Sequence, residues 1–330
     1  MFESIYIEDG VRELASAQKI ISNFPAATQI SCQRYSEVFN RKAQNFRLQK
    51  KKPALILANK FDNFILPVPE GYGIGARHNF YFSHMLNCVY DCRYCFLQGM
   101  YRSANYVLFV NFEDFKDAMK QKIESLKGEQ VHFFSGYDCD SLAFEPLTHF
   151  AEFFLPFFKN NPTASLELRT KSTQIRSLLN TEAIENCIIA FSLTPDEIAQ
   201  TVEHKAPTIE RRLEAMSKLQ SKGWNIGLRF DPLIFQSNYN EIYKELFDNV
   251  FSQLDQSKIH SVSLGSFRLP KNYFQTLSRL YPDEKLFASP LEESDGIISY
   301  KKSLQTELHA FCSNKILQYI PTEKFYCYEN

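Results

Sequence analysis

Three cysteines lie close together in one short segment of the chain, at Cys88, Cys92 and Cys95. Their spacing is C-x3-C-x2-C, so three thiolates can come from a single loop. Three thiolates can hold three irons of a 4Fe–4S cluster, and the fourth iron is then left without a protein ligand. A small molecule can bind at that iron, whereas a closed structural zinc site needs four protein ligands. The spacing therefore indicates a cluster that acts on a bound small molecule.

A zinc site, or a chance grouping, is the alternative for these cysteines. The sequence has no second C-x2-C pair and no closely spaced pair of histidines to complete four ligands. His84 precedes Cys88 by four residues and is a conceivable fourth ligand, but a loop or pocket residue is the simpler interpretation. Cys187 lies in an apolar run and is expected in the core.

Length and charge limit the classes of protein that fit. The 330 residues suffice for one large α/β barrel, or for two or three ordinary domains. A formal net charge of −1 does not indicate nucleic-acid binding by bulk electrostatics. One local exception is a basic run, which fits either a solvated linker or a phosphate-contacting patch. Its members are Arg41, Lys42, Arg47, Lys50, Lys51 and Lys52.

No segment resembles a signal peptide or a membrane span. The first residues lack a basic region followed by a long apolar one. The most apolar run, residues 150–158, is too short to cross a bilayer. We therefore expect a cytoplasmic protein without membrane attachment. Thiols stay reduced in that compartment, so the eight cysteines are interpreted as metal-binding, catalytic or buried, and not as disulfides.

A regular alternation of strands and helices has to position the cysteines. The predicted strands are 79–83, 131–134, 166–168, 187–191, 225–230 and 261–264. Helices are predicted from about residue 147, around 175–179, and over 208–222 and 238–254. Such alternation implies parallel strands joined by helical crossovers. Six units predict an α/β fold with a partial (β/α)6 TIM-like barrel. The closed eight-stranded barrel is the alternative, although two strands are lacking.

Three regions are expected along the chain. Residues 1–75 are predicted as a mixed α/β N-terminal region and residues 76–290 as the partial barrel. Residues 291–330 are predicted as a C-terminal extension that packs on the barrel.

Polar residues follow each of the six predicted strands. In chain order they are Cys88, Cys92 and Cys95; residues 135–141; residues 169–172; Ser192; Arg229 and Asp231; and Ser266 and Arg268. Because active sites of parallel α/β folds lie at the carboxyl ends of the strands, we expect these residues to converge on one face. Arg229 and Arg268 fit either phosphate binding or structural ion pairs.

The cysteine loop after a first strand resembles the radical S-adenosylmethionine superfamily. More closely, Cys-Arg-Tyr-Cys-Phe-Leu-Gln at residues 92–98 is similar to the spore photoproduct lyase family. Further similar segments follow in order at residues 140–148, 169–172, 191–192, 212–215, 227–232, 264–268, 295–296 and 326–329. The resemblance covers roughly residue 80 to the C-terminus. It implies a partial barrel of the radical S-adenosylmethionine type.

The resemblance also implies cofactors and a reaction. Cys88, Cys92 and Cys95 would ligate a 4Fe–4S cluster, and Lys171 and Ser192 would contact S-adenosyl-L-methionine. Reductive cleavage of S-adenosyl-L-methionine would give a 5′-deoxyadenosyl radical, and the enzyme would be a carbon–carbon lyase that repairs a pyrimidine lesion in DNA. The partners implied are lesion-bearing DNA and a reductant such as flavodoxin or ferredoxin. The oligomeric state is not predicted.

The chain departs from the family pattern where hydrogen is returned to the product. Tyr137 occupies the position of the lyase's hydrogen-donor cysteine, and the nearest thiol, Cys139, lies two residues later. Tyr94 matches one tyrosine beside the third cluster cysteine, whereas Phe96 replaces the other. Tyr94, Tyr137 and Cys139 are the catalytic candidates, and the choice between Tyr137 and Cys139 stays open.

Two rival functions remain at this stage. A family relative could act on a peptide, an RNA base or a small molecule, which the tyrosine at position 137 and the phenylalanine at position 96 would suit. A non-catalytic iron–sulfur protein would serve electron transfer or redox sensing, but an open iron and a pocket for S-adenosyl-L-methionine argue against it.

Overall fold

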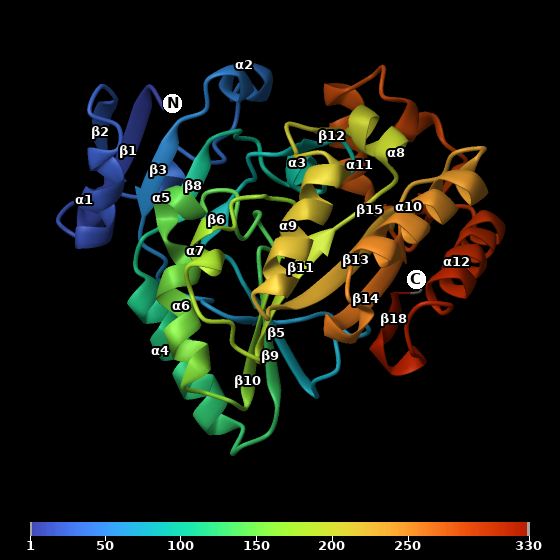
Figure 1. The fold of residues 1–330 in the computed structure, drawn as a ribbon. Helices are drawn as coiled ribbons and strands as arrows, with labels where there is room; N and C mark the ends of the chain where they lie inside the picture. The colour runs from blue at the N-terminus through green and yellow to red at the C-terminus, as the bar shows by residue number, and fades with distance from the viewer. Residues whose placement is uncertain (1, 329–330) are drawn as a thin grey trace.

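The computed structural model describes residues 2–328, and within them the largest sheet has eight strands (Figure 1). Six adjacent strands run parallel and form its centre. They are β5 (His78–Phe82), β9 (Val131–Ser135), β10 (Ala164–Thr170), β11 (Cys187–Ser192), β13 (Asn225–Leu233) and β14 (Ile259–Ser266). These are the six predicted strands. The curled sheet confirms the partial barrel.

One further strand at each edge completes this sheet. At one edge β18 (Phe325–Tyr328) pairs in parallel with β14, and at the other β4 (Leu66–Pro67) pairs antiparallel with β5. Sequence reasoning predicted neither strand. Residues 325–328 therefore contribute a strand to the barrel sheet itself.

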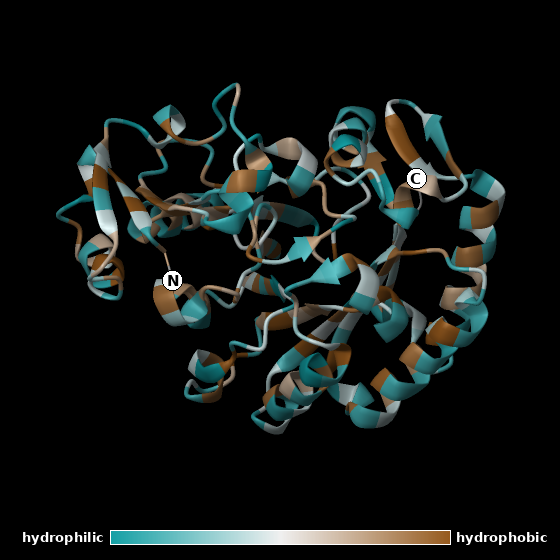
Figure 2. Ribbon diagram, turned by 90° about the horizontal axis from the view of Figure 1, so that it is seen from above, coloured by the Kyte–Doolittle hydropathy of each residue, from teal (hydrophilic) through white to brown (hydrophobic). Residues whose placement is uncertain are grey.

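Helices cover the outer side of the curved sheet (Figures 1 and 2). They include α4 (Phe112–Ser125), α6 (Phe150–Lys159), α7 (Arg176–Leu179), α9 (Ile209–Ser221), α10 (Tyr239–Gln253) and α12 (Lys302–Ile316). Phe150, Phe154 and Phe158 of α6 are fully buried, as their spacing along one helix face requires. Helix α9 begins where the Thr208 side chain accepts a hydrogen bond from the Arg211 amide. Strand β11 is buried throughout, as expected for a parallel strand covered on both faces.

A second sheet is built mainly from the N-terminal region. Its order is β2 (Thr28–Cys32), β1 (Ser4–Glu8), β3 (Leu55–Ala58), β8 (Tyr106–Phe109) and β6 (Met85–Leu86). The helices α1 (Ala15–Ser22) and α2 (Phe46–Lys51) accompany it. Pairing of β3 with β8 carries the sheet across the predicted boundary at residue 75. The division at residues 75 and 290 stays a proposal.

Short elements surround the carboxyl ends of the parallel strands. A small antiparallel sheet joins β15 (Arg268–Pro270), β17 (Ile297–Tyr300) and β16 (Leu291–Ser294). Short helices are α3 (Leu97–Met100), α5 (Glu145–Thr148), α8 (Asp196–Val202) and α11 (Lys271–Leu280). Strand β7 (Asp91–Cys92) pairs antiparallel with β12 (Glu203–His204), so the cysteine loop is tied to a segment that follows β11.

None of the helices in residues 2–328 is long and apolar enough to span a lipid bilayer.

Candidate active site

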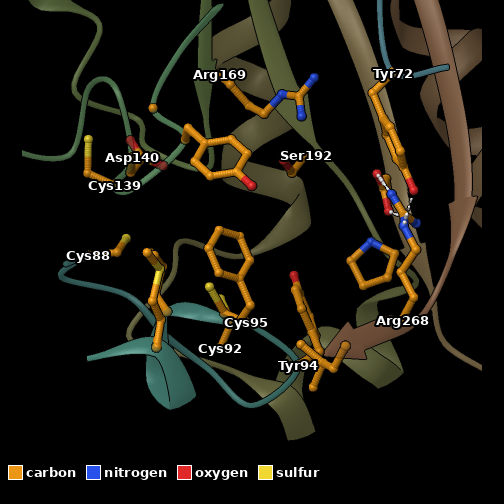
Figure 3. A pocket seen from close by; sticks show the side chains of 18 of the residues that line it. Tyr72, Cys88, Cys92, Tyr94, Cys95, Cys139, Asp140, Arg169, Ser192 and Arg268 are labelled. Atoms are coloured by element: carbon orange, nitrogen blue, oxygen red, sulfur yellow. Dashed lines mark hydrogen bonds and ion pairs between the residues drawn. The ribbon is translucent and has the colours of Figure 1, made fainter. Parts of the chain in front are cut away.

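A cavity of about 570 Å³ lies at the carboxyl ends of the parallel strands (Figure 3). Residues that follow each of the six predicted strands line it, as expected, although Arg229 is not among them. Every sequence-predicted site residue is on its wall: Cys88, Cys92, Tyr94, Cys95, Tyr137, Cys139, Lys171 and Ser192. Its volume lies within the range typical of sites for small molecules and cofactors.

The three cysteines of the loop face this one cavity as free thiols. Within the described residues, no three His, Cys, Asp or Glu side chains are grouped to hold a single metal ion. An all-thiol donor set suits iron–sulfur clusters, and the cavity offers room for a small molecule beside one. The residues present therefore fit a 4Fe–4S cluster held by three thiolates.

Burial raises the pKa of all three thiols. The pKa of Cys92 rises to about 12, although the positive charge of Lys171 opposes the rise. For Cys88 the nearby carboxylate of Asp140 adds to the effect of burial. Iron is bound by thiolate, so filling this site releases protons.

Lys171, in the cavity wall, belongs to a network of charged side chains. Its Nζ lies 3.8 Å from Oε1 of Glu203, and the guanidinium of Arg212 forms an ion pair with the same carboxylate. Burial alone would raise the pKa of Glu203, but the charges of Lys171 and Arg212 hold it below the usual value. Arg212 also donates a hydrogen bond of 3.0 Å to the carbonyl oxygen of Ser192. The network thus connects both predicted S-adenosyl-L-methionine contacts. Sequence reasoning missed Glu203 altogether.

Tyr94 belongs to the same network. Its hydroxyl donates a hydrogen bond to Glu203, and the ammonium of Lys171 lies 5.4 Å from its ring centroid. Burial raises the pKa of Tyr94 well above its usual value. The phenol is therefore neutral and held in one orientation at the cavity wall.

Tyr137 presents an aromatic surface to the cavity. Its side chain is 44% exposed and stacks on Tyr81, with ring centroids 4.3 Å apart. Phe96 lies on its ring at a centroid distance of 5.4 Å. Phe96, which replaces a tyrosine of the family pattern, is thus in contact with Tyr137, which replaces the cysteine.

The thiol of Cys139 has a different environment. The residue is only 8% exposed, and its Sγ lies 3.9 Å from Nδ1 of His84. His84 stacks on Phe150 with ring centroids 3.8 Å apart, and burial lowers the pKa of His84 to about 3. His84 is therefore a neutral, buried residue of the loop and contacts Cys139. It does not line the cavity, so of the predicted loop or pocket positions it has the first.

The loop after β9 is fixed to β10 through Asp140. Its carboxylate accepts hydrogen bonds from the Thr170 hydroxyl at 2.7 Å and the Lys171 amide at 2.6 Å. Gly136 in this loop has a φ of +81°, and a Cβ there would lie 2.6 Å from Oγ of Ser141. The hydrogen bonds of Asp140 and the turn at Gly136 fix this loop, and they thereby set the positions of Tyr137 and Cys139 in the cavity wall.

The two arginines with open assignments form ion pairs. Arg229 is buried and pairs with Glu167 at 2.7 Å, which makes it structural. Arg268 lines the cavity and pairs with Asp231 at 3.1 Å, and it donates a hydrogen bond to the Tyr72 hydroxyl. Arg229 therefore stabilises the interior of the barrel, and Arg268 stabilises the wall of the cavity.

Comparison with known proteins bears on this site. The chain matches the family model described as spore photoproduct lyase over residues 79–327. The spore photoproduct lyase of Bacillus subtilis (strain 168) is 24% identical over 202 residues, which cover 60% of this chain and 59% of that protein. The spore photoproduct lyase of Clostridium acetobutylicum is 22% identical over 243 residues, which cover 70% of this chain and 71% of that protein.

Solved structures share the fold over the whole chain. A spore photoproduct lyase variant with bound AdoMet and dinucleoside spore photoproduct superposes with a TM-score of 0.86 at 18% identity. A spore photoproduct lyase complexed with dinucleoside spore photoproduct gives a TM-score of 0.84 at 17% identity. Each match covers 100% of this chain and 98% of the other.

Proposed function

The chain belongs to the spore photoproduct lyase family, and from this we propose that it is a radical S-adenosylmethionine enzyme that repairs a pyrimidine lesion in DNA. One observation carries the proposal: the three cysteines, Lys171 and Ser192 line a single cavity at the carboxyl ends of the parallel strands. Relatives and solved structures of the family support the same activity.

Cys88, Cys92 and Cys95 would hold a 4Fe–4S cluster. When bound, the cluster and S-adenosyl-L-methionine supply a 5′-deoxyadenosyl radical by one-electron reductive cleavage. The protein would bind and orient the cluster and S-adenosyl-L-methionine and would exclude water from them. The cysteine loop is buried and pairs with β12, which suits this role.

Lys171 and Ser192 would bind the methionine end of S-adenosyl-L-methionine. A lysine ammonium is a compact positive charge suited to a carboxylate. Glu203 already lies near this ammonium, so it keeps the ammonium directed along the cavity wall before the ligand arrives. Arg212 fixes the backbone of Ser192 through its hydrogen bond to the carbonyl oxygen.

The open part of the cavity would take the lesion. Chemistry on a base requires the base to leave the stack, so the lesion would enter extruded from the helix. The stacked rings of Tyr81 and Tyr137, with Phe96 tilted against Tyr137, offer apolar surfaces for it.

We assign the return of hydrogen to Tyr137. Its ring is exposed to the cavity, whereas the thiol of Cys139 lies against His84 in a buried position. The phenol hydroxyl would give a hydrogen atom to the product radical, so its O–H bond breaks and a tyrosyl radical is left. One electron from the reductant and one proton would restore the phenol. Tyr94, with its hydroxyl bonded to Glu203, would hold the cofactor side of the cavity.

A low-potential reductant such as flavodoxin or ferredoxin would provide the electrons. Thiolate-bound clusters and such reductants occur together in reducing surroundings, so the cytoplasm is the location we propose.

The test is anaerobic reconstitution with iron and sulfide, followed by reduction and addition of S-adenosyl-L-methionine. We expect 5′-deoxyadenosine to form, and a dinucleotide spore photoproduct to be converted to two thymines. Failure to form 5′-deoxyadenosine would overturn the assignment as a radical enzyme. Formation of 5′-deoxyadenosine with an intact lesion would overturn the assignment of the substrate.

A further inference from the structure

The basic run near the N-terminus has a definite place in the fold. Residues 40–52 contain six cations and no carboxylate, on a chain whose net charge is −1. They include the short helix α2, and none of them lines the cavity. A substrate bound in the cavity therefore does not explain this concentration of charge.

This segment packs directly against the cysteine loop. Nζ of Lys50 forms an ion pair with Asp91, the residue before Cys92, and donates hydrogen bonds to Gln98 at 2.5 Å and Tyr281 at 2.6 Å. Burial lowers the pKa of Lys50, but the partnership with Asp91 opposes that shift. Lys50 is thus an internal link between the basic run and the loop.

Two backbone contacts extend the same interface. The amide of Ala104 donates to Oε1 of Gln49 at 3.0 Å, and the amide of Arg102 donates to Oδ1 of Asn40 at 2.7 Å. The residues that follow α3 therefore lie along the basic run. The run forms an outer wall of the loop that carries the three cysteines.

The exposed side of this wall combines an apolar centre with positive charges. Leu48 on α2 is 61% exposed. Arg41, Lys42, Arg47, Lys51 and Arg102 are exposed around the same segment. We call Leu48 and these five cations the basic face. An apolar centre with a charged rim is the usual composition of a protein interface.

We propose that the basic face docks an acidic one-electron carrier protein, which delivers its electron to the cluster site behind it. The inference rests on the proposed function, because that function requires one electron for each cleavage of S-adenosyl-L-methionine. The carrier loses one electron, the group held by the cysteines gains it, and no covalent bond of the protein changes. The cations would attract an acidic carrier over a distance, and Leu48 would contact its apolar surface.

Nucleic acid is the competing partner for a basic surface. Phosphate contacts need cations, but they gain nothing from an exposed leucine at their centre. The contacts of the basic run with the cysteine loop would place a docked carrier near the cluster site. A nucleic-acid backbone would gain nothing from that position. The carrier is therefore the partner that the observations favour.

The main test reverses two charges with Lys42→Glu/Lys51→Glu. Rates of 5′-deoxyadenosine formation are measured with reduced flavodoxin and, separately, with dithionite, which needs no docking surface. We expect kcat/KM for flavodoxin to fall by about tenfold or more at low salt, with the dithionite rate unchanged. The difference from the unaltered enzyme should shrink as salt is added.

A matched control reverses two exposed lysines on the outer side of the barrel, Lys218→Glu/Lys222→Glu. It alters net charge equally and should leave the flavodoxin rate unchanged. The variant Leu48→Ser tests the apolar centre without a change in charge and should also weaken flavodoxin docking. Equal flavodoxin rates for the unaltered and Lys42→Glu/Lys51→Glu enzymes, or an equal loss with dithionite, would overturn the proposal.

A binding titration separates this proposal from the proposed function. Oxidised flavodoxin is titrated into the reconstituted protein, without S-adenosyl-L-methionine or lesion, and the Lys42→Glu/Lys51→Glu variant should bind at least about tenfold more weakly. This readout holds even if no 5′-deoxyadenosine forms with either reductant. Loss of affinity for lesion-bearing DNA with unchanged flavodoxin binding would assign the basic face to nucleic acid and overturn the proposal.

Discussion

The hydroxyl of Tyr94 donates a hydrogen bond to the carboxylate of Glu203, which lies 109 residues further along the chain. Pairing of β7 with β12 brings the two residues together. The same carboxylate lies between Lys171 and Arg212, so one buried anion orients a phenol and two cations. Glu203 is therefore the central positioning residue on this side of the cavity.

Replacing Glu203 with glutamine should destabilise the protein. The change leaves the buried Arg212 and the partly buried Lys171 without their anion, and breaking a buried ion pair typically costs about 3–5 kcal/mol. We expect a loss of this order in the free energy of unfolding, measured with urea at neutral pH. The control is Glu214→Gln on the exposed side of α9, where a surface pair with Lys218 predicts a change below about 1 kcal/mol. A similar small change for Glu203→Gln would contradict the assigned role.

Replacing Lys171 with alanine should weaken binding of S-adenosyl-L-methionine to the reconstituted protein. A hydrogen bond to a charged group contributes about 1.5–3 kcal/mol, which corresponds to roughly a 10- to 100-fold rise in Kd. Calorimetric titration measures the change directly. Lys159→Ala removes a surface lysine paired with Glu182 and serves as control. Unchanged affinity in the Lys171 variant would place the ligand elsewhere in the cavity.

Replacing Tyr137 with phenylalanine should separate the start of the reaction from its end. The ring and its stacking on Tyr81 are kept, and only the hydroxyl hydrogen is lost. We expect 5′-deoxyadenosine to form at a near-normal rate. The yield of repaired thymine per 5′-deoxyadenosine should fall by about tenfold or more, because the variant has lost the positioned hydrogen-transfer group. Chromatographic quantification of both products gives the ratio.

Replacing Cys139 with alanine is the complementary experiment. Because its thiol lies against His84 in a buried position, we expect the ratio of repaired thymine to 5′-deoxyadenosine to stay unchanged. A collapse of that ratio in the Cys139 variant, with a normal ratio in Tyr137→Phe, would transfer the hydrogen-donor role to the thiol.

Acid should destabilise the fold through His84. Its pKa is lowered from 6.5 to about 3 by burial, so between these values the unfolded chain binds a proton that the folded protein does not. Stability is therefore lost as pH falls from 6.5 towards 3, by about 5 kcal/mol at most, since one pKa unit corresponds to about 1.4 kcal/mol. Urea unfolding of the His84→Phe variant across this range should show a shallower loss. Parallel curves for the two proteins would exclude His84 as the cause.

The parallel core was readable from the sequence for a physical reason. Strands buried on both faces, such as β11, are short apolar runs, and the phenylalanines of α6 repeat at helical spacing. Strand β18 was missed because its partner β14 lies about sixty residues earlier in the chain. No local pattern predicts a pairing of that kind.

The site was predictable where chemistry follows from spacing, and not where it follows from packing. The cysteine loop is recognisable from three residue types in a fixed pattern. Glu203 carries no such signal, because its importance arises only when Lys171 and Arg212 come to lie beside it. Arg229 was equally ambiguous, since its partner Glu167 belongs to a different strand.

Strand β18 also sets an order of assembly. Tyr328 lies on the cavity wall and belongs to the last strand of the sheet to leave the ribosome, whereas the cysteine loop is made much earlier. While the chain grows, the edge of β14 stays unpaired, and an unpaired edge is open to pairing with other chains. The cavity that would contain a reactive radical is thus closed only after β18 has been made.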